Sequence, residues 1–491
     1  MDSRPNLDLS PDGAPSLEDR SRPPDRPEFA ETAHPLRLEK GSSLLILTPL
    51  DIDRHRNNLE HRRIRYYTDR GYAVTVIYKT MNESHRLRDL VRDTMRFQVA
   101  ERVEDGARII AVDPVANYFG GLRTTADAAS TRDGGGGLSA DRIRRKLIQV
   151  FSPLAVFRDI FSLLCILAVT LRRVSRPSEV VLAFGPWAGL VGLVLRRLGR
   201  ARTLVYEDRD FEPGLYPDRF RQWYVGAIER FGIRRADVVI SVSESLSGRR
   251  WADTKRRTHV IPSGVDRERF EGLPSPDRSA ARLIFVGNLM AWSGIELAIQ
   301  AMRQIRDALP DSRLIVAGRA PVDYAEHLNR LADRHLPPDA VRFLGQLDPA
   351  ALPPLLGGAS VGLACFEPVP FRRYATPLKV VEYMAAGLPI IATEGTEAAA
   401  MVTRHECGVV VRYDPGAMAE AVLRLLDSRE LYERLSRNAA RQSAGYDWTV
   451  LLDRELDIIA EARGRPEAHD AIRRSTDRPE ATHRSETGRA P

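Results

Sequence analysis

A lysine and a glutamate stand three residues apart in a stretch that is otherwise almost wholly apolar. The stretch reads YATPLKVVEYMAAGLPIIAT, residues 374–393, and the charged residues are Lys379 and Glu382. Residues with this spacing lie on one face of a helix. Burying either charge costs free energy unless something compensates it. The two side chains therefore either form an ordinary exposed ion pair or serve a bound ligand.

The surrounding residues predict where this helix begins and ends. Thr376 is a favoured N-cap residue, and Pro377 is suited to the first helical position. The helix is then expected to run to Ala386. Gly387 provides the left-handed residue that ends it, and a proline two residues later prevents continuation.

The start of this helix is predicted to bind an anion. Free N–H groups and the helix dipole favour negative charge at a helix N-terminus. Thr376, Leu378 and Lys379 lie around the first turn. Arg372 and Arg373 come directly before it. We therefore expect the anion to be a phosphate or a diphosphate.

Short apolar runs alternate with helix-like stretches along most of the chain. Such alternation predicts parallel sheets with right-handed crossovers, so the fold class is α/β with two Rossmann-like, doubly wound domains. Ligands of these folds bind at the carboxyl ends of the strands, here in the cleft where the domains face each other. The first series of runs is 43–49, 72–78, 107–113, 179–185, 202–208 and 236–243, and the second is 282–288, 312–318, 341–347, 360–366, 388–393 and 407–412.

Composition changes along the chain predict its division. A chain of 491 residues is too long for one ordinary domain. Residues 1–40 and 464–491 are polar, with few large apolar side chains, and are expected to be disordered tails. The Pro- and Ser-containing break EGLPSPDRSA separates an N-terminal domain, 41–275, from a C-terminal domain, 276–447.

Bulk composition excludes several classes of protein. An apolar content of 43% with 28% charged residues is that of a soluble globular chain. Cys165, Cys365 and Cys407 are far apart, without metal-ligand spacing, and indicate a reduced, cytoplasmic protein. The N-terminus lacks the order of a signal peptide. The net charge of +7 suits an anionic substrate or membrane surface, but the sequence contains no nucleic-acid-binding module.

One basic-flanked segment, 146–173, is long and apolar. Arg158 and Asp159 interrupt it, and Pro153 lies near its start. The unbroken apolar part, 160–171, is shorter than the roughly 20 residues that a membrane span requires. We expect either a core helix or an interfacial helix on an anionic membrane surface, and a span is the least favoured alternative.

The stretch TPLKVVEYMAAGLPIIAT resembles the donor-site signature of GT-B glycosyltransferases, specifically glycosyltransferase family 4. Other segments follow in the family's order: ADVVISVSESL, HVIPSGVDRERF, LIFVGNLMAWSGIELAIQAM, RLIVAGRAP and VRFLGQLDPAALPPLLGGASVGLACFEP. YDWTVLLDREL resembles the family's last helix, so a helix that crosses back to the first domain is expected at 448–463. The resemblance covers residues 42–463 and implies the GT-B fold.

The resemblance also implies roles for individual residues. Glu382 matches the second glutamate of the family's paired motif, which binds the donor ribose. The first glutamate, which contacts the donor sugar, is replaced by Tyr374. The residues expected to bind the donor are Gly287, Asn288, Gly294, Arg372, Tyr374, Thr376, Leu378, Lys379 and Glu382.

The loop after the first strand of the second domain departs from the family pattern. Two basic residues usually hold the diphosphate there, and Asn288 and Ser293 stand in their places. Gly287 and Gly294 keep the tight loop that exposes backbone. Lys379, helped by a neighbouring arginine, is expected to supply the missing charge.

An acidic cluster, YEDRDFEP at 206–213, ends a strand of the first domain, where the family binds its acceptor. We expect Glu207, Asp208 or Asp210 to contact the acceptor hydroxyl or the donor sugar. The alternative is a solvated acidic turn. No acidic pair suits a metal ion. The resemblance implies a retaining, metal-independent enzyme with no cofactor beyond a UDP- or GDP-sugar donor.

The expected function is therefore a glycosyltransferase of hexosyltransferase type. It would move a sugar to a glycan or lipid-linked saccharide in cell-surface polysaccharide synthesis, in the cytoplasm and peripherally on the membrane. Two alternatives remain: a nucleotide-sugar epimerase on the same fold, and a non-catalytic GT-B scaffold. The residues at positions 288, 293 and 374 leave the second alternative open.

Overall fold

The computed structural model describes residues 38–53, 59–80, 98–113, 156, 159–216 and 218–463, all within the compact unit Leu36–Pro491. The tails expected at 1–40 and 464–491 lie outside these residues, except for 38–40. The first part of the apolar segment 146–173 lies outside them as well, except for residue 156.

The first sheet has the strand order β3-β4-β2-β1-β5-β6-β7-β8. Its neighbouring strands are parallel, apart from the antiparallel pair β3 and β4. The order reverses between β1 and β5, so the loops after these two strands begin at a topological switch point. The strands are β1 (Ser43–Thr48), β2 (Ala73–Lys79), β3 (Gln98–Glu104), β4 (Ala107–Asp113), β5 (Ser178–Phe184), β6 (Ala201–Asp208), β7 (Val238–Ser241) and β8 (His259–Val260).

The antiparallel edge strand β3 was not expected from the sequence. It pairs with β4 through a tight hairpin whose turn is Asp105 and Gly106, with φ of 48° and 76°. An Asp-Gly turn with two positive φ angles matches the twist of the strands that it joins. The first sheet is therefore mixed at one edge rather than wholly parallel.

The second sheet is wholly parallel, in the order β11-β10-β9-β12-β13-β14. Its order reverses between β9 and β12, which places the loops after these two strands side by side. The strands are β9 (Arg282–Val286), β10 (Arg313–Ala317), β11 (Val341–Gly345), β12 (Val361–Ala364), β13 (Ile390–Thr393) and β14 (Gly408–Val411).

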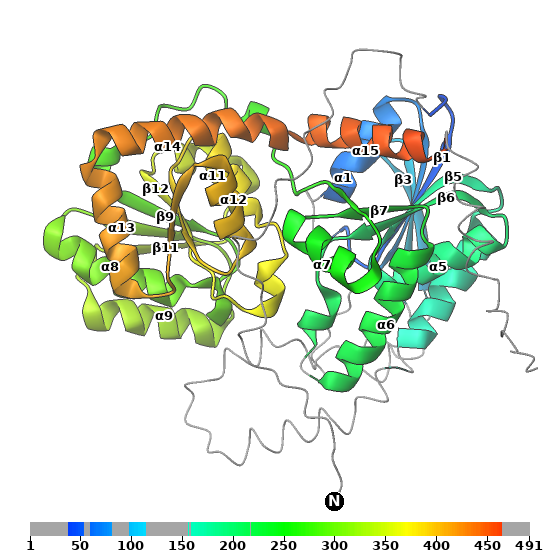
Figure 1. Ribbon diagram of the computed structural model, residues 1–491, viewed down its shortest axis with the longest axis horizontal. Coiled ribbons are helices and arrows are strands. Elements are labelled where there is room, and N and C mark those ends of the chain that lie inside the picture. Colours follow the sequence, from blue (N-terminus) through cyan, green and yellow to red (C-terminus); the bar gives the residue numbers. More distant parts are fainter. Residues whose placement is uncertain are drawn as a thin grey trace, which may run out of the picture. The chain divides into compact units, whose positions relative to one another are not determined.

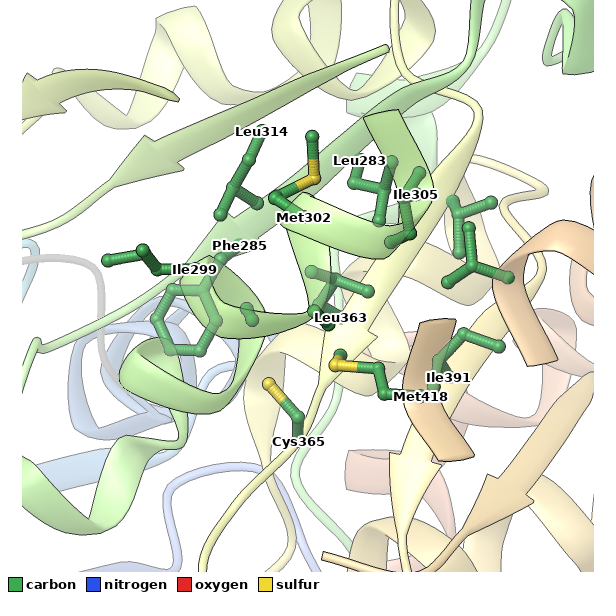
Figure 2. Packing of buried hydrophobic residues seen from close by; sticks show 14 of the residues in the cluster. Leu283, Phe285, Ile299, Met302, Ile305, Leu314, Leu363, Cys365, Ile391 and Met418 are labelled. Carbon is green, nitrogen blue, oxygen red and sulfur yellow. The ribbon is translucent and has the colours of Figure 1, made fainter. Parts of the chain in front are cut away.

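Amphipathic helices bury the faces of both sheets. In the second domain, Ile299, Met302 and Ile305 of one helix pack onto Leu283 and Leu363 of the sheet (Figure 2). Their spacing of three places them on one side of that helix. The helices are α1 (Leu59–Asp69), α5 (Gly185–Arg197), α6 (Arg219–Arg235), α7 (Glu244–Thr254), α8 (Ile295–Ala308), α9 (Val322–His335), α10 (Leu352–Gly357), α11 (Leu378–Ala385), α12 (Glu397–His405), α13 (Pro415–Asp427), α14 (Arg429–Gln442) and α15 (Trp448–Arg463).

The last helix, α15, completes the core of the first sheet although it follows the second sheet in sequence. Figure 1 shows α15 beside α1. Trp448, Leu451 and Ile459 belong to the same hydrophobic core as strands β1 and β2. Glu455 of α15 also accepts hydrogen bonds from Arg63 and Tyr67 of α1. The two doubly wound sheets, parallel except for the edge strand β3, confirm the predicted fold class.

Candidate functional site

The start of α11 differs from the sequence prediction in one respect. The helix begins at Leu378, with Pro377 at the N-cap position and no side-chain cap. Thr376 instead donates its hydroxyl to the Val242 carbonyl, over 2.7 Å. The predicted N-cap role of Thr376 is therefore wrong, because the loop after β7 takes the hydroxyl. The predicted left-handed Gly387, with φ of 68°, is confirmed.

Lys379 is buried beside this uncapped helix start. Its side chain is 7% exposed, and its Nζ lies 3.5 Å from the Phe285 ring centroid and 4.6 Å from that of Phe366. Burial lowers the pKa of the Lys379 amine to about 7. Within the described part of the chain, no hydrogen bond or ion pair holds this amine. The aromatic rings compensate only part of its charge, which leaves the amine able to bind an anion.

The loop after β9 brings bare backbone next to this amine. A Cβ atom on Gly287 would lie 3.5 Å from the Lys379 Nζ. A Cβ atom on Gly294, whose φ is 78°, would lie 1.5 Å from the Cys365 carbonyl oxygen. Only glycine fits that second position. The loops after β9 and β12 therefore pack backbone to backbone at the switch point.

The two positions where the family carries basic residues have different environments. Asn288 is exposed. Ser293 is fully buried, and its hydroxyl accepts a hydrogen bond from the Met290 N–H over 3.3 Å. Ser293 therefore holds the loop together. A positive charge for a diphosphate must come from elsewhere, and Lys379 is placed to provide it.

Glu382 lies one turn further along α11, partly buried. Burial raises the pKa of its carboxyl, and the positive charges of Arg269, Lys379 and Arg62 act in the opposite direction. Among the described residues, no ion pair joins Glu382 to Lys379. The sequence left open whether these two residues are an ordinary exposed ion pair, and the structure excludes that interpretation.

Arg372 lies in an aromatic cluster before α11. Its guanidinium carbon is 3.8 Å from the Trp292 ring centroid and 5.0 Å from that of Phe371. Its Nε is buried without a hydrogen-bond partner among the described residues. Burial lowers the pKa of Arg372 to about 10, and the nearby Asp210 carboxylate opposes that shift. Arg372 is therefore a cation with an unused donor.

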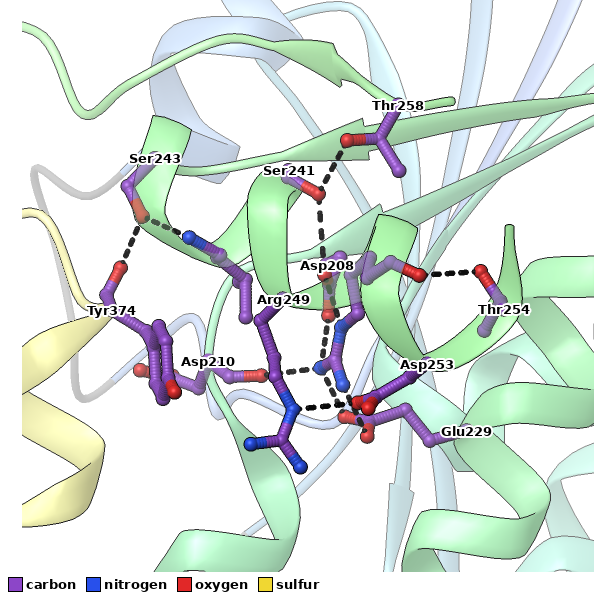
Figure 3. A network of polar contacts seen from close by, with 12 residues as sticks. Asp208, Asp210, Glu229, Ser241, Ser243, Arg249, Asp253, Thr254, Thr258 and Tyr374 are labelled. Carbon is purple, nitrogen blue, oxygen red and sulfur yellow. Dashed lines mark hydrogen bonds and ion pairs between the residues drawn. The ribbon is translucent and has the colours of Figure 1, made fainter. Parts of the chain in front are cut away.

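Tyr374 occupies the position of the family's first glutamate. Its ring lies 5.2 Å from that of Phe211, centroid to centroid. Its carbonyl accepts a hydrogen bond from the Ser243 hydroxyl over 2.5 Å, as Figure 3 shows. Thus a residue of the loop before α11 contacts residues that follow β6 and β7. Tyr374 offers no carboxylate to a sugar.

Glu207 is 2% exposed and engaged by arginines. It forms ion pairs of 2.5 Å with Arg63 and with Arg209. These positive charges lower the pKa of the Glu207 carboxyl against the opposing effect of burial. Its carboxylate links β6 to α1 and is held in ion pairs with two arginines. The geometry does not favour direct contact with a substrate.

Asp208 is equally buried, in the network drawn in Figure 3. It accepts two hydrogen bonds of 2.7 Å from Arg250 and one of 3.2 Å from the Ser241 hydroxyl. Arg250 also pairs with the Glu229 carboxylate over 2.6 Å. Asp208 therefore joins β6 to α6 and α7 and, like Glu207, is poorly placed to contact a substrate.

Asp210 lies beyond the end of β6 and is partly exposed. Burial raises the pKa of its carboxyl to about 6, although the charges of Arg372 and Arg209 lower it. Of the acidic residues predicted from the sequence, Asp210 alone forms no ion pair with an arginine within the described ranges. It is the member of the cluster that is best placed to meet a ligand near Arg372.

Glu212 is a second candidate, which the sequence reasoning missed. Its Oε1 would lie 3.6 Å from a Cβ atom on Gly185, the left-handed residue that opens α5. Burial, with the charges of Asp210, Glu229 and Asp208, raises the pKa of the Glu212 carboxyl to about 8. A sequence signal for Glu212 existed. The strand β6 ends at Asp208, so the acidic residues that follow Asp208 lie beyond the sheet.

The described residues contain no group of three or more His, Cys, Asp or Glu side chains placed to hold a metal ion. Cys165, Cys365 and Cys407 are free thiols. No helix in the described ranges is both long and apolar enough to cross a membrane.

The sequence is similar to those of known glycosyltransferases. Residues 280–428 match the family model described as "Glycosyl transferases group 1". The D-inositol 3-phosphate glycosyltransferase 2 of Catenulispora acidiphila is 29% identical over 228 residues, which cover 43% of this chain and 51% of that protein. The phosphatidyl-myo-inositol mannosyltransferase of Mycobacterium tuberculosis is 26% identical over 214 residues, which cover 42% and 54%. The matches thus span little more than half of each relative.

A solved structure shares the architecture over nearly the whole length. Anabaena HepE, solved in complex with UDP and glucose, superposes with a TM-score of 0.56. The superposition covers 86% of this chain and 99% of that protein, at 18% sequence identity. The likeness shows the GT-B fold, and the predicted resemblance to GT-B glycosyltransferases is confirmed.

Proposed function

We propose that this chain, whose residues 280–428 match the model of group 1 glycosyl transferases, transfers a sugar from a nucleoside diphosphate sugar to an acceptor hydroxyl. One observation carries the proposal. The Lys379 amine is buried, has no hydrogen bond or ion pair among the described residues, and lies beside an uncapped helix start and the bare backbone of Gly287. A diphosphate would satisfy all of these groups.

The donor would be held by residues of the second domain. Lys379 and the first N–H groups of α11 would bind the diphosphate, with Arg372 contributing its unused Nε donor. Glu382 would accept hydrogen bonds from the ribose hydroxyls. Fixed donors aimed at the leaving group stabilise the charge that develops on it in the transition state.

In the proposed step, the bond between the anomeric carbon and the diphosphate oxygen breaks. A bond from the acceptor oxygen to that carbon forms on the same face, so the configuration is retained. The acceptor's proton passes to the departing diphosphate. Asp210 and Glu212, partly buried beyond β6, would orient the acceptor hydroxyl. We propose no metal and no cofactor besides the donor.

The proposed donor is a UDP- or GDP-sugar, and UDP is the first choice because HepE was solved with it. The proposed acceptor is a glycan or lipid-linked saccharide in cell-surface polysaccharide synthesis. Polysaccharide synthesis is supported by a relative named as a putative colanic acid biosynthesis glycosyltransferase of Escherichia coli, and a lipid acceptor by the relative named for phosphatidyl-myo-inositol. The reaction is proposed to take place in the cytoplasm, at the membrane face. An anionic membrane surface, bound through 146–173, is a further proposed partner.

The experiment is a UDP-release assay with a panel of UDP- and GDP-sugars, with and without lipid extract. Release that requires both a donor and an acceptor supports the proposal. An epimerase would convert the donor without any acceptor, and a scaffold would bind UDP without turnover. Either outcome would contradict the proposed transfer.

A further inference from the structure

Helix α6 is labelled in Figure 1. It exposes aromatic rings next to arginines. Phe220, Trp223 and Phe231 are 47%, 65% and 46% exposed. Their spacing along α6 places them on one side of the helix. The rings of Phe220 and Trp223 stack with their centroids 6.2 Å apart, and the Arg235 guanidinium carbon lies 5.0 Å from the centroid of the Phe231 ring. Exposed apolar side chains that gather in one patch, rather than singly, often mark an interaction site.

A helical segment at 159–173 adds further apolar surface next to α6. The Tyr224 hydroxyl of α6 donates a hydrogen bond to Asp159 over 2.9 Å, so the start of this segment lies against α6. Its exposed residues Ile160, Phe161 and Leu164 lie within the next turn and a half, at 44%, 46% and 55% exposure. We name the combined surface the aromatic–arginine face. It consists of Ile160, Phe161, Leu164, Arg219, Phe220, Trp223, Phe231, Arg234 and Arg235.

This face carries positive charge without exposed carboxylates. Across α6 and the segment 159–173, the acidic residues are Asp159 and Glu229. Glu229 is buried and paired with Arg250 over 2.6 Å. Asp159 is held by Tyr224. Asp253 of α7 lies beside Arg234, but its carboxylate is paired with Arg249 over 2.7 Å. An apolar surface bordered mainly by arginines complements an anionic, amphipathic partner.

We propose that the aromatic–arginine face binds the surface of an anionic phospholipid bilayer. The rings would enter the headgroup region, where amphipathic aromatic side chains are favoured, and the arginines would pair with lipid phosphates. A second copy of this chain is a poorer occupant, because a two-fold contact would bring arginines against arginines. The proposal deepens the proposed location at the membrane face by naming the surface that binds the bilayer, and it does not depend on sugar transfer.

The test is flotation of the purified full-length chain, without donor, on phosphatidylcholine vesicles with or without phosphatidylglycerol. Binding is expected only with phosphatidylglycerol, and it should weaken between about 0.1 M and about 1 M salt as the charges are screened. Arg219→Gln and Arg235→Gln should each lower binding about fivefold, the equivalent of about 1 kcal/mol. Phe220→Ser combined with Trp223→Ser should lower it about tenfold at either salt concentration.

Matched controls lie in the second domain. Val322→Ser removes a side chain of α9 that is 74% exposed, and Arg303→Gln removes an exposed arginine of α8. Neither should change flotation. Calorimetry with UDP should give the same affinity for all variants, which separates this proposal from sugar transfer.

Three results would overturn the membrane proposal. The first is wild-type protein that fails to float at low salt, and the second is face variants that float as well as the controls. The third is sedimentation showing a wild-type dimer that Trp223→Ser dissociates. That result would make the face a contact between copies of the chain.

Discussion

Arg250 donates two hydrogen bonds of 2.7 Å to the Asp208 carboxylate, and each side chain is 1% exposed. Arg250 also binds Glu229, so one guanidinium joins strand β6 to helix α6. A buried charge that loses its partner is strongly destabilising, whereas an exposed pair is worth little. Asp208 is therefore expected to act on stability rather than on chemistry.

Asp208→Asn should lower the free energy of unfolding by about 3 kcal/mol, because Arg250 keeps its burial but loses a countercharge. Urea unfolding measures this. The control is Asp253→Asn, which breaks the exposed 2.7 Å pair with Arg249 and should cost less than about 1 kcal/mol. An Asp208→Asn variant that is fully stable but inactive would instead assign Asp208 to the reaction.

Lys379→Met should weaken UDP binding about tenfold or more without lowering stability. The substitution keeps the length of the side chain and removes a buried charge that costs free energy in the empty protein, while a charged hydrogen bond to the diphosphate contributes about 1.5–3 kcal/mol. Calorimetry and urea unfolding report the two effects separately. Lys255→Met, at an exposed lysine, is the control. Unchanged UDP affinity would remove Lys379 from the donor site.

UDP binding should weaken as the pH rises above about 7, the pKa to which burial lowers the Lys379 amine. Above that pH the amine of the empty protein is neutral. A bound diphosphate raises the pKa of the Lys379 amine, so UDP binding is accompanied by uptake of a proton. The affinity for UDP therefore falls by up to about tenfold for each pH unit above that pKa. The other groups acting on this amine are Cys365, Arg372 and Glu382. Calorimetry in buffers of different ionisation enthalpy counts the protons, and Lys379→Met should abolish the uptake.

Glu382→Gln should weaken UDP binding by about 1–2 kcal/mol, because the ribose hydroxyls lose a charged acceptor. The same substitution should leave the binding of inorganic pyrophosphate, which has no ribose, unchanged. Calorimetry with both ligands makes the comparison. Equal losses for UDP and pyrophosphate would show that Glu382 acts only through the charge near Lys379.

Asp210→Asn and Glu212→Gln should slow transfer about 100-fold or more if these carboxyls orient the acceptor, while UDP affinity stays unchanged. Because burial and neighbouring charges raise the pKa of Glu212 to about 8, its carboxyl is mostly protonated at neutral pH and Gln mimics its shape. Stability should therefore change little. Steady-state kinetics with varied acceptor provides the measurement. Normal turnover in both variants would place the acceptor elsewhere.

The strands could be predicted because local patterns determine them. Apolar runs bounded by turn residues located every parallel strand of the second sheet, and Gly387 marked the end of α11. The edge strand β3 was not predicted, although the Asp-Gly pair at 105–106 is typical of a β-hairpin turn. Its exposed, charged sequence does not look like the buried strands beside it.

The partners of the site residues could not be predicted, because they are distant in sequence. The sequence gives no sign that Glu207 is paired with Arg63 of α1. It likewise gives no sign that Asp208 is paired with Arg250 of α7. Thr376 looked like a helix cap, but Val242 takes its hydroxyl. Local sequence shows which groups are available for bonding. Only the packing of the elements determines which of them are already bonded.

The position of α15 has a consequence for biosynthesis. The first domain emerges from the ribosome before the second, and N-terminal domains generally fold as they emerge. Here the apolar face that Trp448, Leu451 and Ile459 cover stays exposed until α15 has been translated, after the whole second sheet. Until then Arg63 and Tyr67 lack Glu455. The nascent first domain is therefore expected to need protection by chaperones, and a chain truncated before Trp448 should be insoluble.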